Sequence, residues 1–155
     1  HRRYYAFDLC PGFWNALSLA HKNGNVISID HVRAELTAPK GKDKLSAWVE
    51  ALPKTWFVNT SSQTVLEKYA EMVKWVNADA GFSQTAKSEF AAKADVWLLA
   101  YAKLNGTTLV THEVLDRQCK RKVPMPNVCD AFKIKYSDTF EMLKALNIKF
   151  ELVED

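Results

Sequence analysis

Short β-prone runs alternate with helical segments along this chain, and this alternation constrains the fold more than any other feature of the sequence. Apolar and β-branched residues gather at residues 4–7, 26–29 and 107–111, and apolar and polar residues alternate at 148–152. Between these runs, apolar residues recur at the three- and four-residue spacing of helices. Strands separated by helices are typical of a mainly parallel sheet. We therefore predict an α/β fold, a three-layer α/β/α sandwich with a short, mainly parallel central sheet.

The expected helices begin and end at common capping and breaking residues. They run from Pro11 to the stop at Asn23-Gly24, over 31–36 after Asp30, over 45–52, over 62–76, from about 85 to 104 with an interruption near Asp95, and over 137–146. Residues 56–58 and 127–128 can add two short extended pieces. No linker, repeat or low-complexity segment divides the chain, so we predict a single domain over residues 1–155, in which residues 1–3 can be an expression remnant.

Composition excludes several broad classes of protein. The 155 residues are 48% hydrophobic and 25% charged, which excludes a disordered or collagen-like chain. The longest apolar run, 96–102, is far shorter than the roughly 20 residues that a membrane-spanning helix needs, and no signal segment is recognisable. The three cysteines, Cys10, Cys119 and Cys129, show no CxxC pair, so reduced thiols are expected and a zinc site with His112 is disfavoured. These features predict a cytoplasmic protein without membrane contact.

Four acidic residues fall where a parallel sheet has its functional crevice, outside the carboxyl ends of its strands. Asp8 and Glu113 follow two of the β-prone runs, Asp95 lies at the start of the most apolar helix, and Glu35 borders the apolar face of its helix. Each has an ordinary structural explanation as a turn residue, helix cap or surface ion pair. A cluster of all four, however, would repel itself unless cations lay between the carboxylates. The pattern therefore predicts a site for Mg²⁺ or Mn²⁺.

In their sequence contexts these acids resemble the four acidic motifs of the PIN-domain nucleases. The segments that carry the resemblance are Phe7-Asp8, Val32-Arg33-Ala34-Glu35-Leu36, the run from Ala94-Asp95 to Ala102, and Leu109-Val110-Thr111-His112-Glu113. The resemblance covers nearly the whole chain. It implies an α/β/α sandwich, divalent-metal-dependent endonucleolytic cleavage of RNA, and a toxin held by an antitoxin, as in many small prokaryotic members. It also implies metal-ligand roles for Asp8, Glu35, Asp95 and Glu113. Separately, we expect Asp116, about one turn after Glu113, as a substitute or helper ligand.

Three positions differ from the pattern that is common in small PIN toxins. Leu9 and Cys10 stand where those proteins have a hydroxyl residue and an Asn, and Glu113 replaces the more usual Asp. These differences favour an alternative function, a catalytically inactive PIN-like module that binds RNA or a protein partner. No Ser–His or Cys–His spacing suggests a covalent nucleophile. The leading hypothesis is therefore metal-dependent hydrolysis of RNA without a covalent enzyme intermediate.

A basic cluster follows the last of the four acids. Its members are Arg117, Lys120, Arg121 and Lys122. The net charge of +3 does not by itself indicate a nucleic-acid-binding protein, but a cationic rim beside an anionic pocket suits an RNA strand. A solvated loop explains such a charge run equally well.

Further contacts are expected from aromatic and apolar residues. An exposed ring among Phe13, Trp14 and Trp97 could stack on an RNA base, although burial in the core is the more common role of such residues. A groove between the helices at 45–52 and 62–76 could receive an antitoxin helix, and a homodimer is a further expected assembly.

Overall fold

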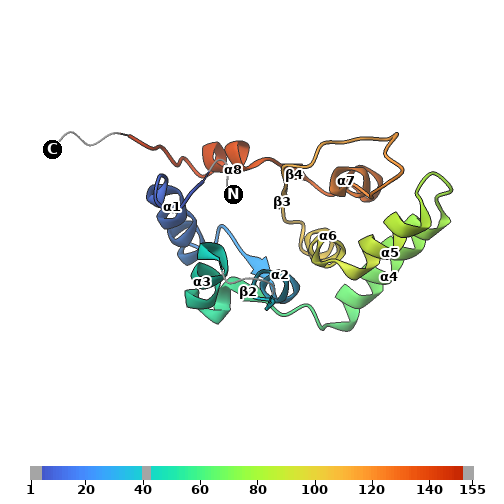
Figure 1. Ribbon diagram of the computed structural model, residues 1–155, viewed down its shortest axis with the longest axis horizontal. Coiled ribbons are helices and arrows are strands. Elements are labelled where there is room, and N and C mark those ends of the chain that lie inside the picture. The colour runs from blue at the N-terminus through green and yellow to red at the C-terminus, as the bar shows by residue number, and fades with distance from the viewer. Residues whose placement is uncertain (1–4, 40–42, 152–155) are drawn as a thin grey trace.

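Two pairs of parallel strands lie among helices in the computed structural model, which describes residues 5–39 and 43–151 (Figure 1). β1 (Ser28–Ile29) pairs with β2 (Phe57–Val58), and β3 (Leu109–Val110) pairs with β4 (Tyr136–Ser137). Both pairs are parallel, because the crossover connections contain helices. The predicted α/β class is confirmed, but within the described residues the strands form two separate sheets.

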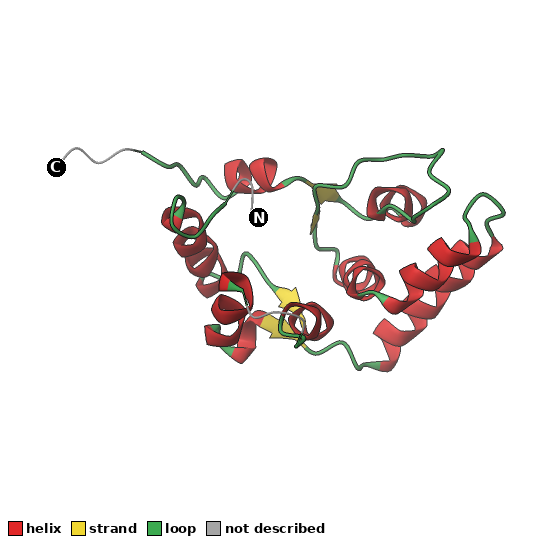
Figure 2. Ribbon diagram, viewed as in Figure 1, coloured by secondary structure: helices red, strands yellow, loops and turns green. Residues whose placement is uncertain are grey.

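Helices account for most of the described chain (Figure 2). They are α1 (Pro11–Lys22), α2 (Asp30–Leu36), α3 (Lys44–Ala51), α4 (Gln63–Ala78), α5 (Gln84–Ala92), α6 (Ala94–Asn105), α7 (Met125–Phe132) and α8 (Thr139–Ala145), with a short 3₁₀ turn η1 (Lys54–Trp56). Figure 1 shows α4, α5, α6 and α7 together on one side of the strands, and α1, α3 and α8 on the other.

Several helix ends follow from the capping residues that the sequence shows. Pro11 begins α1, where its missing N–H costs nothing. The Ser62 hydroxyl accepts a hydrogen bond from the Val65 N–H at the start of α4. Gly106 ends α6 with φ of 64°, in the left-handed region that glycine adopts without strain. These ends agree with the sequence prediction, as does the break between α5 and α6.

Three predicted strands do not form within the described residues, outside which Tyr4 and Leu152 of the predicted runs lie. Phe7 lies in a turn that the Leu9 and Cys10 N–H groups close by donating to the Ala6 carbonyl, so residues 5–7 lead into α1. Residues 127–128 lie inside α7, because Pro124 and Pro126 occupy positions around its first turn that proline tolerates. Residues 148–151 have no strand partner. Conversely, β4 at 136–137 was not predicted from the sequence.

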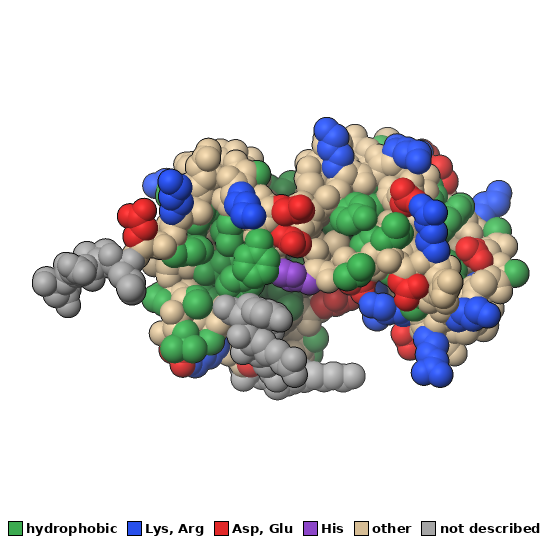
Figure 3. Space-filling view, turned by 90° about the horizontal axis from the view of Figure 1, so that it is seen from above, with side chains coloured by type: hydrophobic (Ala, Val, Ile, Leu, Met, Phe, Trp, Pro, Cys, Tyr) green, Lys and Arg blue, Asp and Glu red, His purple; other side chains and the backbone are tan. Residues whose placement is uncertain are grey.

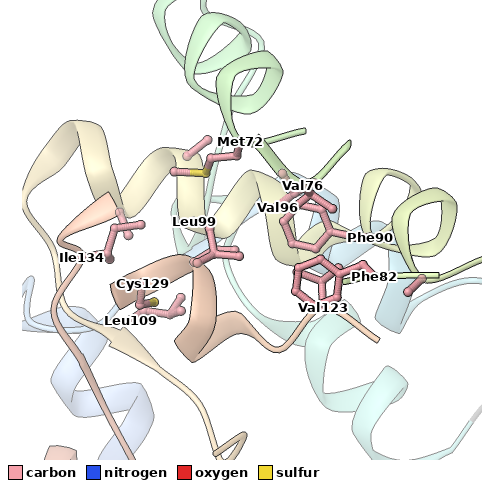
Figure 4. Packing of buried hydrophobic residues seen from close by; sticks show 14 of the residues in the cluster. Met72, Val76, Phe82, Phe90, Val96, Leu99, Leu109, Val123, Cys129 and Ile134 are labelled. Atoms are coloured by element: carbon pink, nitrogen blue, oxygen red, sulfur yellow. The ribbon is translucent and has the colours of Figure 1, made fainter. Parts of the chain in front are cut away.

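The larger hydrophobic core is built around α6 (Figure 4). Val96, Leu99 and Ala100 of this helix are 0% exposed. They belong to a cluster that also contains Met72, Val76, Phe82, Phe90, Leu109, Val123, Cys129 and Ile134. A helix that contacts neighbours on nearly every side must be apolar almost all round. This explains the run at 96–102.

A smaller aromatic cluster lies between α1, α3 and α8. The Phe13 ring stacks on Tyr5 at 3.9 Å between centroids, and the Trp14 ring stacks on Phe7 at 4.0 Å. Leu143 of α8 and Trp48 of α3 complete it. The two clusters cover opposite sides of the strand pairs.

Candidate acidic site

The N-terminus of α6 brings three of the four predicted acids together. Asp95 lies in the first turn of α6, Glu35 lies on α2, and Glu113 lies in the segment that follows β3. Burial raises the pKa of Asp95 above its ordinary value of 3.8, and the negative charges of Glu113 and Glu35 raise it further. Carboxylates that are distant in the sequence therefore influence one another directly.

Asp95 is the least compensated member of this acidic cluster. Its side chain is half-buried, and its carboxylate has no hydrogen-bond or ion-pair partner among residues 5–39 and 43–151. Lys93 and Lys122 offset only part of the unfavourable charge. An ionised carboxylate in such surroundings is costly without a cation. Nevertheless, no three His, Cys, Asp or Glu side chains of the described residues lie close enough together to hold a metal ion as they stand.

Glu35 also holds the start of α6. Its Oε1 accepts a hydrogen bond of 2.7 Å from the Ala94 N–H, and the residue that precedes Ala94, Lys93, provides no side-chain cap. The first N–H groups of a helix need an acceptor and attract negative charge. The position of Glu35 at the border of an apolar helix face thus brings its carboxylate to a helix terminus.

Glu113 performs the same role for α7. Its Oε2 accepts a hydrogen bond of 2.7 Å from the Met125 N–H, and its Oε1 accepts one of 2.9 Å from Lys122 Nζ. Burial alone would raise the pKa of Glu113, but these hydrogen bonds and the charge of Lys122 outweigh it and hold the pKa below its ordinary value of 4.5. Glu113 is therefore ionised at neutral pH and joins β3 to α7.

Replacing Glu113 with Ala should destabilise the fold by about 1 kcal/mol at neutral pH, because the start of α7 loses its acceptor. Since the pKa of Glu113 is lowered in the folded state, its contribution is complete above pH 4.5 and is lost as the pH falls through the folded-state pKa. Melting curves of the two proteins at pH 7 and pH 3 check this. Glu113→Gln keeps an acceptor oxygen, so its melting temperature at pH 7 should lie between those of the original chain and Glu113→Ala. If the difference in melting temperature between the original chain and Glu113→Ala does not shrink at pH 3, the assignment is contradicted.

Asp8 does not join the acidic cluster, which corrects the four-residue prediction. Its side chain is 67% exposed, its Oδ2 lies 3.6 Å from Lys44 Nζ, and its charge is not among those that act most on Asp95. The physical reason is that residues 5–7 form no strand and Asp8 itself lies in the turn over residues 7–9, so its side chain does not lie at the end of a strand.

The predicted helper ligand Asp116 serves its own loop. Its Oδ1 accepts a hydrogen bond from the Gln118 N–H, and its backbone N–H donates to Asn127 Oδ1. These bonds connect the loop to α7. The carboxylate is thus used to form a local turn.

The basic residues after Glu113 are partly neutralised. Arg117 pairs with Asp130 at 2.8 Å, and Lys122 pairs with Glu113. Lys120 and Arg121 have exposed side chains. Figure 3 shows basic side chains over the half of the molecule that carries α4, α5 and α7, with acidic side chains between them. The rim is therefore of mixed charge.

The aromatic residues considered for base stacking are not available for it. Trp97 is covered on both faces, by the His31 ring at 4.2 Å and by the Tyr69 ring at 4.2 Å. Phe13 and Trp14 are each 6% exposed. Their role is to pack the core, which is the more common role of such residues.

The groove expected for an antitoxin helix does not form. α3 packs into the smaller aromatic cluster through Leu45 and Trp48, whereas α4 packs into the larger core through Met72 and Val76. Figure 1 shows the two helices apart from each other. Segments that are close in the sequence here belong to different halves of the fold.

Asp30 is a strand-end acid that sequence reasoning treated only as a helix cap. It directly follows β1, and its Oδ1 accepts a hydrogen bond of 2.6 Å from the hydroxyl of Thr60, which is 0% exposed. Burial alone would raise the pKa of Asp30, but hydrogen bonds from Thr60 and His31 outweigh it and lower the pKa. The carboxylate is fully used in joining β1, β2 and α2. The rule that selected Asp8, namely that an acid directly after a β-prone run is a candidate site residue, would also have selected Asp30.

The three cysteines, Cys10, Cys119 and Cys129, form no disulfide. Burial raises the pKa of the Cys129 thiol to about 12. A thiol with this pKa is protonated at neutral pH and is a poor nucleophile.

Fold and site together define an α/β protein with an acidic cluster at the start of its central helix. The sequence matches, over residues 1–150, the family described as "Domain of unknown function (DUF4411)", and the chain belongs to this family. No curated protein and no solved structure matches the chain. Within the described residues, no helix has the length and apolar character needed to cross a membrane.

Proposed function

We propose that this protein is a divalent-metal-dependent endoribonuclease with a PIN-like three-layer fold. The observation that carries the proposal is the half-buried Asp95 carboxylate, which has no hydrogen-bond or ion-pair partner in the described part of the chain and is acted on by the charges of Glu113 and Glu35. Such an arrangement stores unfavourable electrostatic energy that a cation would relieve. Most acids in a stable fold are compensated, as Asp30 is, so an uncompensated group suggests a functional site.

The donor atoms suit Mg²⁺ or Mn²⁺, which prefer carboxylate oxygens. Asp95 has two available oxygens, Glu35 uses Oε1 for the Ala94 N–H, and Glu113 would exchange its contact with Lys122 for the ion. As they stand the three carboxylates do not form a metal-holding group, so their side chains would have to move to bind one ion together. A bound ion would act as a Lewis acid and lower the pKa of a bound water. The chain's own contribution is to hold the three acids at two helix termini and to bind RNA phosphates through Lys120 and Arg121.

Metal binding is tested first by thermal melting of the full chain with MnCl₂. Mn²⁺ at a concentration of about 100 times its Kd should stabilise the folded state by about 2.7 kcal/mol. For a chain of this size, each kcal/mol corresponds to roughly 2–4 °C in melting temperature. Cleavage of an end-labelled single-stranded RNA should appear with Mn²⁺ and disappear with EDTA. An Asp8→Asn variant is the matched control and should behave like the original chain.

A second candidate function is a non-catalytic binding module. It is favoured by the fact that both oxygens of Glu113 already have partners, the Met125 N–H and Lys122. In that case Mn²⁺ raises the melting temperature no more for this protein than for a Glu113→Gln variant, and no RNA is cleaved. The same titration therefore distinguishes the two candidates.

We extend the proposal to the cellular location and the partners that the resemblance to PIN-domain nucleases implies. The protein would act in the cytoplasm as a toxin, bound by an antitoxin and assembled as a homodimer. Co-purification with the product of a neighbouring gene and light scattering of the purified chain test these two partners.

A further inference from the structure

The parallel strands form two separate pairs, and one edge of each pair is open. Within the described residues, β1 is hydrogen-bonded to β2 and β3 to β4, with no ladder between the two pairs. Parallel sheets normally have both faces covered, and sheets most often contain about four to six strands. Two isolated parallel pairs in one small protein are therefore an unusual arrangement.

One helix connects the two pairs. α6 contacts β1 and β3 more extensively than it contacts β2 or β4, so β1 and β3 are the inner strands. Figure 1 shows β3 and β4 above, and β1 and β2 below, the level of α6. A helix is about 10 Å across, whereas neighbouring strands are about 4.8 Å apart. By these general dimensions, two strands that pack on either side of one helix lie about two strand spacings apart, the separation at which one further strand would bond to both.

The hydrogen bonds of β3 show which backbone groups face this space. The Leu109 N–H donates to the Lys135 carbonyl at 2.8 Å, and the Thr111 N–H donates to the Ser137 carbonyl at 2.9 Å. Alternate residues of a strand direct their N–H and C=O groups to opposite edges. The N–H and C=O of Val110 therefore point away from β4. The Val110 side chain is 39% exposed, although Leu109 and Thr111 are 5% and 8% exposed.

We propose that a further strand lies between β1 and β3 in the complete sheet. It is an extended segment of polypeptide, parallel to both strands, that residues 5–39 and 43–151 do not contain. An open edge supplies main-chain hydrogen bonds to an added strand, and the pockets beside it select the side chains. α6 and the larger core cover one face of this position, and parallel sheets normally have both faces covered. Its sequence is therefore a continuous run of Val, Ile or Leu residues.

The test supplies such a segment and follows the amide of Val110. One variant of the full chain carries an N-terminal Val-Ile-Val-Leu-Val segment and a flexible Gly/Ser linker. The matched control has Pro at the second and fourth positions of the segment, which cannot join a central strand. Exchange of the Val110 N–H, measured by NMR, should slow by roughly tenfold or more in the first variant only. Exchange of the Leu109 N–H, already bonded to Lys135, should change little.

The outcomes separate this inference from the metal proposal, on which it does not depend. Equal exchange of Val110 in both folded variants would overturn it. A Val110 amide that is already protected in the unextended chain, together with a dimer in light scattering, would also overturn it, because a second copy then covers the edge. If the extension prevents folding, the same segment is added as a free acetylated peptide to the unextended chain, with the same criteria for Val110.

Discussion

An Asp95→Asn variant is expected to be more stable than the original chain without metal, and inactive with it. Because the folded-state pKa of Asp95 is raised above 3.8, its ionised form destabilises the fold at neutral pH. Asn removes this charge, so the melting temperature should rise by a few degrees at pH 7. The gain should disappear below pH 3.8, where Asp95 is protonated in both states. Loss of a metal ligand removes several kcal/mol of transition-state stabilisation, so cleavage should fall by at least about 100-fold.

Asp95→Asn should raise the melting temperature and reduce RNA cleavage, and these opposite effects on stability and activity make the test specific. A variant that was merely misfolded would lose activity and stability together. Asp30→Asn is the matched comparison, because the pKa of Asp30 is lowered by its partners and its replacement should destabilise the fold at pH 7. An Asp95→Asn protein that still cleaves RNA with Mn²⁺ would show that Asp95 is no ligand. One that melts at a lower temperature than the original chain would contradict the electrostatic assignment.

Leu99→Ala should cause the largest loss of stability among single core substitutions in α6. Leu99 is 0% exposed and lies at the centre of the larger core, where the surrounding helices cannot close the cavity completely (Figure 4). Truncating a fully buried Leu to Ala at such a position should lower the free energy of unfolding by about 2–5 kcal/mol. At roughly 2–4 °C per kcal/mol, the melting temperature should fall by about 5–15 °C.

Leu104→Ala provides the control on the same helix. Leu104 is 38% exposed, so the same change in side chain removes much less buried surface. Its replacement should cost less than about 1 kcal/mol. Equal effects of the two substitutions on the melting temperature would mean that the core is not organised around α6 as described.

The helices could be predicted from the sequence better than the strands, because their signals are local. Ser62 and Gly106 mark helix ends through hydrogen bonds and dihedral angles within a few residues. A strand of two residues has no comparable signal, since its existence depends on a partner elsewhere in the chain. Tyr136–Ser137 forms β4 only because β3 lies beside it.

The structure brings together three of the acids that the sequence singled out, Glu35, Asp95 and Glu113, and leaves Asp8 apart from them. Asp95 and Glu35 converge because α2 packs against α6, where the His31 ring stacks on Trp97 and the Ala94 N–H donates to Glu35. Asp8 was assigned from a β-prone run that has no strand neighbour in the described chain. The pairing of Lys122 with Glu113 depends on the path of an irregular loop, which no pattern in the sequence specifies.

The capping roles of Glu35 and Glu113 affect how members of this family should be compared. Selection for a stable fold alone would preserve both glutamates, because each holds the start of a helix. Under the proposed function, a family member that has lost catalysis would therefore keep them, and their presence in a sequence is poor evidence of activity. Asp95 contributes no such bond and is disfavoured in the folded state at neutral pH. Under the proposed function, Asp95 is therefore the one of the three acids whose retention should distinguish active family members from inactive ones.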